Sequence, residues 1–344
     1  MPEIYYSQAA QWEDFLAKLK EDFRVYLPQV KEDNYFYQEY KDSRIPFSFN
    51  AYRPVQPIKS FLTYPKEKVV EDFFSAKPIE DFTPTVVVGL KNCDLHSLKI
   101  QDFVFKEGIE VDPLYNLRRE NTILISGDCT GFKEVCFCLA LEVLPHPMEG
   151  FDLNLSPLTD GFLLEVGSKR GDELVKKYQK YFIKSKESQI SARDSKRKNL
   201  IDELNNHLKA KDLPKKDILQ KIVKKGYNAN TWGNLCLTCV ECGACNFICC
   251  TCHCFLLSDI QDKKRYARLR VWDSCQYANF ARVAGGANPL KRRGQRLRNR
   301  FSKKFDFFVD NLGMPACEGC GRCIEACPAK IDIREVLKDL AKNA

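Results

Sequence analysis

The sequence lacks any apolar run near the roughly 18 to 20 uncharged residues that are needed to span a bilayer. Residues 1–12 also lack a basic segment followed by an apolar core, which a secretory signal requires. We therefore expect a cytoplasmic protein without a membrane span. The 344 residues are 44% hydrophobic and 29% charged, a composition typical of globular proteins that bury a core.

Nucleotide-binding motifs are missing as well. No G-x-G-x-x-G follows a predicted strand and no P-loop is present, so neither dinucleotide nor nucleotide binding is encoded in a recognisable form. Residues 1–92 contain no cysteine, which excludes the C-x-x-C pair that nickel–iron catalytic subunits carry near each terminus. The sequence predicts no catalytic residues for two-electron chemistry on a substrate.

Cysteine is abundant but unevenly placed. There are 17 cysteines, none before Cys93, none between Cys138 and Cys236, and eight from Cys236 to Cys254. The cysteines of a disulfide framework are spread along short secreted domains, where they join distant loops. Thiols two or three residues apart in a chain without a secretory signal favour metal ligation instead.

The densest cysteine pattern occurs twice. Cys239-x-x-Cys242-x-x-Cys245-x-x-x-Cys249 is repeated as Cys317-x-x-Cys320-x-x-Cys323-x-x-x-Cys327-Pro328. This is the spacing of bacterial ferredoxins, in which three close thiolates hold one [4Fe–4S] cluster and the fourth cysteine reaches the other cluster. The pattern predicts two clusters with crossed ligands. We define the first ferredoxin site as Cys239, Cys242, Cys245 and Cys327, and the second ferredoxin site as Cys317, Cys320, Cys323 and Cys249.

Two zinc ribbons are the alternative, because paired C-x-x-C motifs also bind zinc. A structural zinc ion takes four ligands in two pairs, so the third C-x-x-C step and the trailing cysteine would be surplus in both halves. The iron–sulfur interpretation uses all eight thiols, and we prefer it.

A third group of thiols follows two predicted strands. Residues 85–90 and 122–125 are short β-branched runs typical of buried strands, and residues 94–105 between them have helical spacing. A strand–helix–strand unit places both strands in parallel, so the loops after them meet at the carboxyl edge of one sheet. The thiols in those two loops, which we call the rim site, are Cys93, Cys129, Cys136 and Cys138.

The rim site predicts a third [4Fe–4S] cluster. The alternative is four ordinary buried cysteines, which are common as small apolar residues. Four thiols in two rim loops, with none elsewhere in that part of the chain, favour the cluster. His96 is a possible alternative ligand, but it falls within the helical pattern, and we expect it to be a surface or packing residue.

These patterns predict an α+β or α/β N-terminal domain followed by a bacterial-type 2[4Fe–4S] ferredoxin domain. We place the N-terminal domain at residues 1–185, a charged helical linker at 186–230, and the dicluster domain with a basic insertion at 231–344. Further helices are predicted at 8–23, 171–182 and 216–225. A strand pair is predicted at 151–158 and 162–166.

Five cysteines remain without an assigned role: Cys236, Cys250, Cys252, Cys254 and Cys275. They could complete or replace a ligand of the third cluster if the domains dock. They could equally line the core around the two ferredoxin clusters. The sequence does not decide between these uses.

The insertion contains a basic segment, residues 291–304, with eight basic residues and no acidic one. A nucleic-acid-binding arm is one interpretation. The other is a cationic helix inside the cluster domain that faces the negative clusters or docks an acidic partner, and we prefer it because its location explains the charge locally. The whole chain has a net charge of only +8, from 54 basic and 46 acidic residues, so we expect no nucleic-acid partner.

Several motifs together resemble a known family. They include Gly89-x-x-x-Cys93-Asp94, Asp128-Cys129 with Cys136-Phe-Cys138, and Trp272-Asp-Ser-Cys275 before the second ferredoxin half. From about Tyr52 to Leu340 the chain resembles the iron–sulfur β subunits of cytoplasmic nickel–iron sulfhydrogenases, a family that includes the A subunit of anaerobic sulfite reductase. The chain departs from the family pattern at Cys250, where a proline is usual, and at Lys91-Asn92 before Cys93.

The resemblance implies an electron-transfer subunit of a multi-subunit oxidoreductase. Such a subunit passes single electrons between a flavin- and [2Fe–2S]-containing subunit of ferredoxin-reductase type, which handles NAD(P)H, and a catalytic subunit of hydrogenase or sulfite-reductase type. It also implies a cluster on the N-terminal domain, held by the rim-site cysteines. A subunit with its own sulfur-compound-reducing site at that cluster is the alternative, so the sequence leaves open whether the chain is itself an enzyme.

Overall fold

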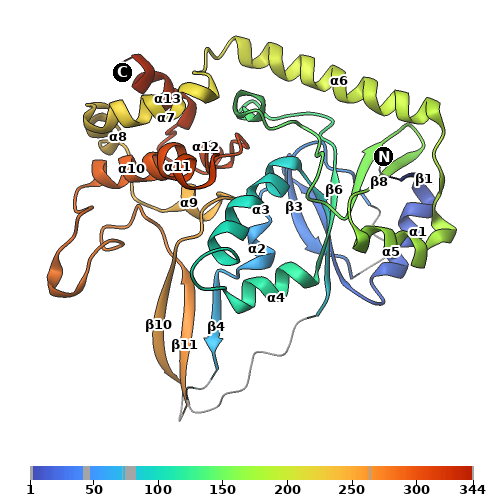
Figure 1. Ribbon diagram of the computed structural model, residues 1–344, viewed down its shortest axis with the longest axis horizontal. Helices are drawn as coiled ribbons and strands as arrows, with labels where there is room; N and C mark the ends of the chain where they lie inside the picture. Colours follow the sequence, from blue (N-terminus) through green and yellow to red (C-terminus); the bar gives the residue numbers. More distant parts are fainter. Residues whose placement is uncertain (1–2, 42–46, 72, 74–82, 263–264, 343–344) are drawn as a thin grey trace.

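The computed structural model describes residues 3–41, 47–71, 73, 83–262 and 265–342, and it contains two sheets (Figure 1). The larger sheet has eight strands in the order β3-β2-β5-β6-β7-β8-β1-β9. Strands β2, β5, β6 and β7 run parallel to one another, and the other neighbours are antiparallel. Their bounds are β1 Ile4–Gln8, β2 Arg24–Lys31, β3 Asn34–Glu39, β5 Thr85–Leu90, β6 Thr122–Gly127, β7 Leu153–Pro157, β8 Gly161–Val166 and β9 Ile183–Lys184.

Helices cover both faces of this sheet, and the residues of β5 alternate between the two cores. Val86 and Val88 pack in a cluster with Trp12 of α1, and Val87 packs in another with Leu98 of α3. A strand buried on both faces reads as a continuous apolar run, which is why residues 85–90 are recognisable in the sequence. One face carries α1 (Ala9–Leu19) and α5 (Lys169–Lys177), and the other carries α2 (Lys59–Leu62), α3 (Asn92–Phe105) and α4 (Pro113–Asn121).

The mixed α/β architecture confirms the predicted N-terminal fold class, and most predicted elements lie where the patterns placed them. Asp112 caps α4, its Oδ1 accepting a hydrogen bond from Tyr115 N at 2.8 Å, and Pro113 occupies the first turn. The predicted strand pair forms the antiparallel neighbours β7 and β8. The predicted helix at 171–182 is shorter than expected: α5 ends at Lys177, and a 3₁₀ turn, Gln179–Tyr181, follows.

A long helix, α6 (Glu187–Lys209), runs from the sheet to the C-terminal region (Figure 1). Short helices then surround the ferredoxin motifs, and a π-helical turn, Lys303–Phe307, follows α10 directly. Their bounds are α7 Leu219–Lys225, α8 Thr231–Cys236, α9 Ala244–Phe247, α10 Arg293–Ser302, α11 Phe308–Leu312, α12 Arg322–Glu325 and α13 Ile333–Lys342. No helix in the described ranges is long and apolar enough to cross a membrane.

The smaller sheet was not predicted. Strands β10 (Phe255–Asp262) and β11 (Arg265–Trp272) form a hairpin inside the ferredoxin region, and β4 (Lys66–Val70) pairs with β11 from the N-terminal region. The hairpin was missed because the charged residues along both strands obscure the alternation that marks a strand. A strand from one region therefore completes a sheet in the other.

The N-terminal and C-terminal regions also share a hydrophobic core. Phe137 and Val143, which follow β6, pack in one cluster with Phe301 of α10 and Leu337 of α13. At the same junction the buried guanidinium of Arg322 donates to Asp94 Oδ2 at 2.6 Å. The domain boundaries after residues 185 and 230 stay predictions, and contacts across them hold the two regions together.

Candidate iron–sulfur sites

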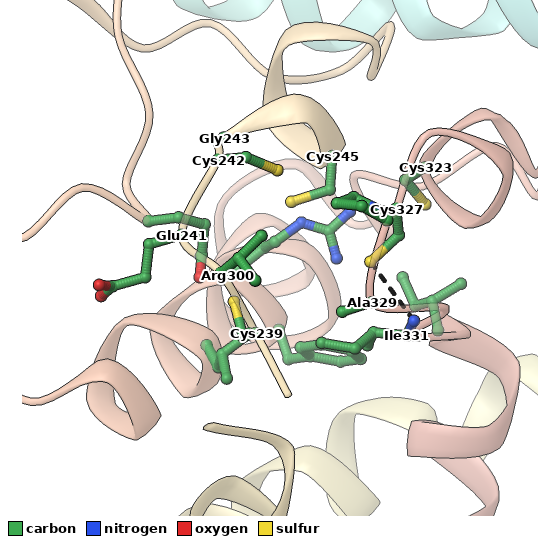
Figure 2. Close-up of a pocket in the computed structure, with 16 residues that line it drawn as sticks. Cys239, Glu241, Cys242, Gly243, Cys245, Arg300, Cys323, Cys327, Ala329 and Ile331 are labelled. Atoms are coloured by element: carbon green, nitrogen blue, oxygen red, sulfur yellow. Dashed lines mark hydrogen bonds between the residues drawn. The ribbon is translucent and has the colours of Figure 1, made fainter. Parts of the chain in front are cut away.

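The four thiols of the first ferredoxin site line a single cavity (Figure 2). Cys239 and Cys242 come from the loop between α8 and α9, Cys245 lies in the first turn of α9, and Cys327 comes from the segment after α12. Ile331 N donates a hydrogen bond to Cys327 Sγ at 3.3 Å, as backbone amides do toward cluster ligands. Cys323, predicted for the second ferredoxin site, also borders this cavity. The structure therefore brings the first predicted set together and places the second next to it.

Thiols of the second ferredoxin site lie next to that cavity. Lys304 Nζ donates both to Cys249 Sγ at 3.2 Å and to Ala316 O at 2.9 Å, so the trailing cysteine of the first half lies beside the residue that precedes Cys317. Each half of the repeat thus contributes its trailing cysteine to the neighbourhood of the other half. The crossed assignment of these cysteines to two clusters stays a prediction.

The two halves of the repeat share their backbone conformation. The residue before the second cysteine has a positive φ in both halves, 57° at Glu241 and 62° at Gly319, and so does the residue after it, 75° at Gly243 and 71° at Gly321. These left-handed residues turn the chain so that closely spaced thiols face one side, and glycine adopts them without strain. Glycine is required at 319 for a further reason, since a Cβ there would lie 2.6 Å from Cys138 Cα.

The rim site forms a second cavity at the carboxyl edge of β5 and β6. All four of its thiols line that cavity, together with Lys91, Gly319 and Cys320. Cys93 lies in the first turn of α3, and Cys129 is held in the loop after β6 by a hydrogen bond from its backbone N to Pro145 O at 2.8 Å. The fold thus gathers the four rim-site cysteines, as the strand–helix–strand pattern predicts.

The rim site and the second ferredoxin site touch. Phe137 N donates to Gly319 O at 2.8 Å, between two rim ligands on one side and the loop carrying Cys320 on the other. Cys320 lines the rim cavity, while Cys323 borders the first ferredoxin cavity. The second ferredoxin site therefore lies between the other two.

Burial makes some of the free thiols poor acids. It raises the pKa of Cys129 to about 12 and that of Cys245 to about 11. Without metal such thiols hold their protons near neutral pH, so iron binding must displace protons from them. A metal–thiolate centre provides the compensation that a lone buried thiolate lacks.

Three buried cations surround the second ferredoxin site. Lys304 Nζ donates to Cys249 Sγ at 3.2 Å, to Thr251 Oγ1 at 2.9 Å and to Ala316 O at 2.9 Å. Lys59 Nζ donates to the backbone oxygens of Asn246 and Cys252, at 3.1 and 2.9 Å.

Arg300 is the third of these cations. Its Nε donates to the Asn246 side chain at 3.1 Å, while its buried Nη2 has no partner among the described residues. Burial opposes the positive charge on Lys304 and Arg300, yet the surrounding thiols raise the pKa of both above the ordinary values.

These cations test whether the sites suit iron–sulfur clusters. Lys59, Arg300 and Lys304 are only 4%, 6% and 4% exposed, and no carboxylate of the described residues pairs with them. An isolated buried charge costs several kcal/mol, so buried cations need buried anions. A [4Fe–4S] cluster with four thiolates is a dianion when oxidised and gains one more negative charge when reduced. The thiol sets and the unpaired cations together fit such clusters.

The basic segment 291–304 divides between the interior and the surface. Arg296, Arg300 and Lys304 are buried, four residues apart, so they lie on one helical face that continues from α10 into the π-helical turn. Lys291 and Arg292 are exposed. The cationic helix inside the cluster domain is therefore present. The four-residue spacing of Arg296, Arg300 and Lys304 could have identified them in the sequence as one helical face, distinct from the basic residues at the surface.

No role was predicted for Lys59 or Lys91, although Lys91 was noted as a departure from the family pattern. No other basic residue lies next to either in the sequence, so no cluster of positive charge marks them. Lys91 Nζ donates to Asp128 O at 2.8 Å beside the rim cavity, and burial lowers its pKa to about 8. The departure from the family pattern before Cys93 thus places a buried amine next to the rim site.

The five unassigned cysteines occupy different places. Cys250 lies between the rim site and the second ferredoxin site: its Sγ donates to Cys93 O at 3.8 Å, and the neighbouring Cys249 and Cys320 thiols raise its pKa. Cys252, Cys254 and Cys275 line a small cavity with Arg300 and Lys304. Cys236 lies at the end of α8. His96 Nδ1 is hydrogen-bonded to the buried Glu318 carboxylate at 2.6 Å, which accords with a packing residue rather than a ligand.

Comparison with known proteins agrees with this geometry. A family model described as a 4Fe-4S dicluster domain matches residues 238–331, which span both ferredoxin motifs. The chain is also 31% identical over 332 residues to sulfhydrogenase 2 subunit beta of Pyrococcus furiosus, and the match covers 96% of each chain.

Proposed function

The chain belongs to the family of sulfhydrogenase beta subunits, and on that basis we propose that it is the iron–sulfur relay of a multi-subunit oxidoreductase. Single electrons would pass through it between a flavin- and [2Fe–2S]-containing subunit and a catalytic subunit of hydrogenase or sulfite-reductase type. The cofactors proposed are three [4Fe–4S] clusters, one in each ferredoxin site and one in the rim site.

One observation carries the proposal: the three thiol sets form an unbroken series. Cys320 belongs to the second ferredoxin set and lines the rim cavity, and Cys323 belongs to the same set and borders the first ferredoxin cavity. An electron that enters the rim site or the first ferredoxin site would have the second ferredoxin site as its neighbour, because a ligand of that site lines each of the two outer cavities. A protein that used its thiols only for structure would not need this order.

The residues around the sites have separate tasks in a relay. The twelve cysteines would hold the clusters, each of which accepts or gives up one electron at a time. Lys59, Arg300 and Lys304 compensate negative charge in the interior, and the hydrogen bond from Lys304 Nζ to Cys249 Sγ stabilises that thiolate. The shared core at the junction keeps water away from the middle site and fixes the spacing of all three.

Metal and sulfide analysis of the anaerobically purified chain tests the proposal. We expect about twelve iron atoms and about twelve acid-labile sulfides per chain, and reductive titration should consume three electrons. About eight irons would remove the rim cluster. Tightly bound zinc without iron would refute the relay, and co-purification from the native source would identify the catalytic subunit.

A second cavity next to Cys129 favours one alternative function. It reaches Cys129 from the side of α6 and is also lined by Asp128, Arg193, Lys196 and Arg197. A small sulfur compound could approach the rim site by this route. Both arginines are already paired with the carboxylates of Asp128 and Glu165. Because these pairs leave less positive charge to bind an anionic sulfur compound, we prefer the relay function. Turnover of sulfite or polysulfide by the isolated chain with a reduced dye would establish the alternative.

A further inference from the structure

The first ferredoxin site reaches the protein surface at Cys242. Of the seventeen cysteines, all of which the structure describes, Cys242 alone is exposed. The rim cysteines are buried or half-buried, and so are the ligands of the second ferredoxin site. Since electron transfer to another protein needs a cluster near the surface, the series of sites opens at this end.

Apolar side chains surround Cys242. Leu237 and Val240, in the loop that carries the first ligands, are 81% and 63% exposed. Tyr277 is also exposed and packs against Phe247 with ring centroids 6.0 Å apart, and the Phe247 ring lies against Gly243, the residue after Cys242. These three exposed side chains form an apolar patch around one ligand. An interface uses such a patch to exclude water from its centre.

A basic margin borders the apolar patch. The segment between β11 and α10 projects from the body of the molecule (Figure 1), and it carries the exposed residues Arg282, Lys291 and Arg292. At the start of α10, Arg293 Nη1 donates to Cys236 O at 2.9 Å, which holds this segment against the loop that carries Cys239 and Cys242.

Few acidic residues offset this margin. Residues 274–305 contain none, and the half-exposed Asp273 just before them is a single carboxylate. Glu241, beside Cys242, is paired with Arg293 and Arg296, so its charge is already compensated. The surface around Cys242 is therefore apolar at its centre and positively charged at its edge.

From this arrangement we propose that the surface formed by Leu237, Val240, Cys242, Tyr277, Lys291 and Arg292 docks an acidic one-electron carrier protein. The inference rests on the proposed relay function and names the partner of its exposed end. Opposite charges steer such carriers to their sites and raise the association rate. An apolar centre with a charged margin suits a small interface that forms and dissociates in each transfer.

The reaction at this surface is a single electron transfer. The reduced carrier, an acidic iron–sulfur protein, loses one electron, and the first ferredoxin site gains it. No bond is formed or broken, and no proton needs to move. The reverse transfer uses the same contacts, so the surface serves either direction of electron flow.

Stopped-flow kinetics with a reduced acidic [2Fe–2S] ferredoxin as the probe tests the docking surface. In the anaerobic, iron-loaded chain, the second-order rate constant should fall steeply as salt is raised, because screening weakens steering. The double variant Lys291→Glu/Arg292→Glu should lower that constant at least about tenfold at low salt and remove most of its salt dependence. Its iron content and its reduction by a small viologen dye should match those of the wild type.

A matched control separates the local effect from net charge. Lys169→Glu/Lys198→Glu makes the same change in charge at exposed positions on α5 and α6, outside the ferredoxin motifs. An equal loss of rate in this control, or a wild-type rate independent of salt, would overturn the docking surface. If the dye reduces the wild type while the ferredoxin does not, the docking surface is wrong and the relay stands. A chain without iron would refute the relay itself.

Discussion

The ferredoxin sites and the rim site gather their thiols by different means. In the ferredoxin sites, three thiolates of each set lie three residues apart on one short loop and the first turn of the helix after it, and left-handed residues at equivalent positions turn both loops in the same way. In the rim site, Cys93 and Cys129 follow different strands and meet only because β5 and β6 are parallel neighbours. One arrangement is local, and the other depends on the sheet.

The surroundings differ as well. Three buried cations around the second ferredoxin site have no carboxylate partner among the described residues, whereas the rim site has one buried amine, Lys91, and rests on a sheet with its own hydrophobic cores on both faces. The ferredoxin region should therefore depend on its clusters for stability. The N-terminal region should keep its fold without one.

Removing all iron should change the stability of the two regions most, and by different amounts. Three buried cations without anions would each cost several kcal/mol, a sum comparable with the about 5–15 kcal/mol that stabilises a typical domain. We expect limited proteolysis of the chelator-treated chain to digest residues 238–331 rapidly and to leave fragments of the eight-stranded sheet intact. The iron-loaded chain is the control. Equal digestion rates in the two regions would show that they do not differ in this way.

Substituting one rim ligand should have a smaller and more local effect. Cys129→Ser should lose about four irons of about twelve while the signals of the two ferredoxin clusters persist. Cys254→Ser is the matched control, since Cys254 is half-buried but lies outside the three predicted sets. Iron analysis and electron paramagnetic resonance measure both variants. Full iron in Cys129→Ser, or loss of iron from Cys254→Ser, would contradict the assignment.

Breaking the junction between the regions should destabilise the whole chain. Arg322 and Asp94 form a fully buried pair, with side chains 1% and 0% exposed, and Asp94 Oδ1 also accepts from Ile58 N at 3.1 Å. Arg322→Ala leaves the buried carboxylate uncompensated and should lower the free energy of unfolding by about 3–5 kcal/mol. Denaturant unfolding measures this change. Arg268→Ala, which breaks the exposed pair with Asp259, should leave the free energy of unfolding unchanged.

The smallest expected effect is electronic. Lys304→Met removes a buried charge 3.2 Å from Cys249 Sγ and should disfavour the reduced, more negative cluster of the second ferredoxin site. We expect its reduction potential to fall by on the order of 60 mV, a tenfold change in a one-electron equilibrium. Redox titration followed by electron paramagnetic resonance measures the shift. Lys303→Met, one residue away and half-exposed, should shift the potential far less.

The sequence predicted more of the sites than of the elements around them. Strands β5 and β6 were recognisable because both of their faces are buried, and the thiols at their ends followed from the parallel connection. The smaller sheet was missed because β4 pairs with β11 across almost two hundred residues of chain, and local patterns do not encode such a pairing. The buried roles of Lys59 and Lys91 were missed for the same reason.

The amino-acid sequence alone determined the cofactor class. The number of residues between ligands can be counted in the sequence, and the spacing in the two ferredoxin motifs suits iron–sulfur clusters better than zinc. Only the tertiary structure decided the order of the sites, with the second between the rim and the first, and the exposure of Cys242 at one end. It also decided which cations of the basic segment face inward. The order of the sites, the exposure of their ligands and the burial of the cations depend on contacts between residues far apart in the chain. The spacing of cysteines along the chain does not determine those contacts.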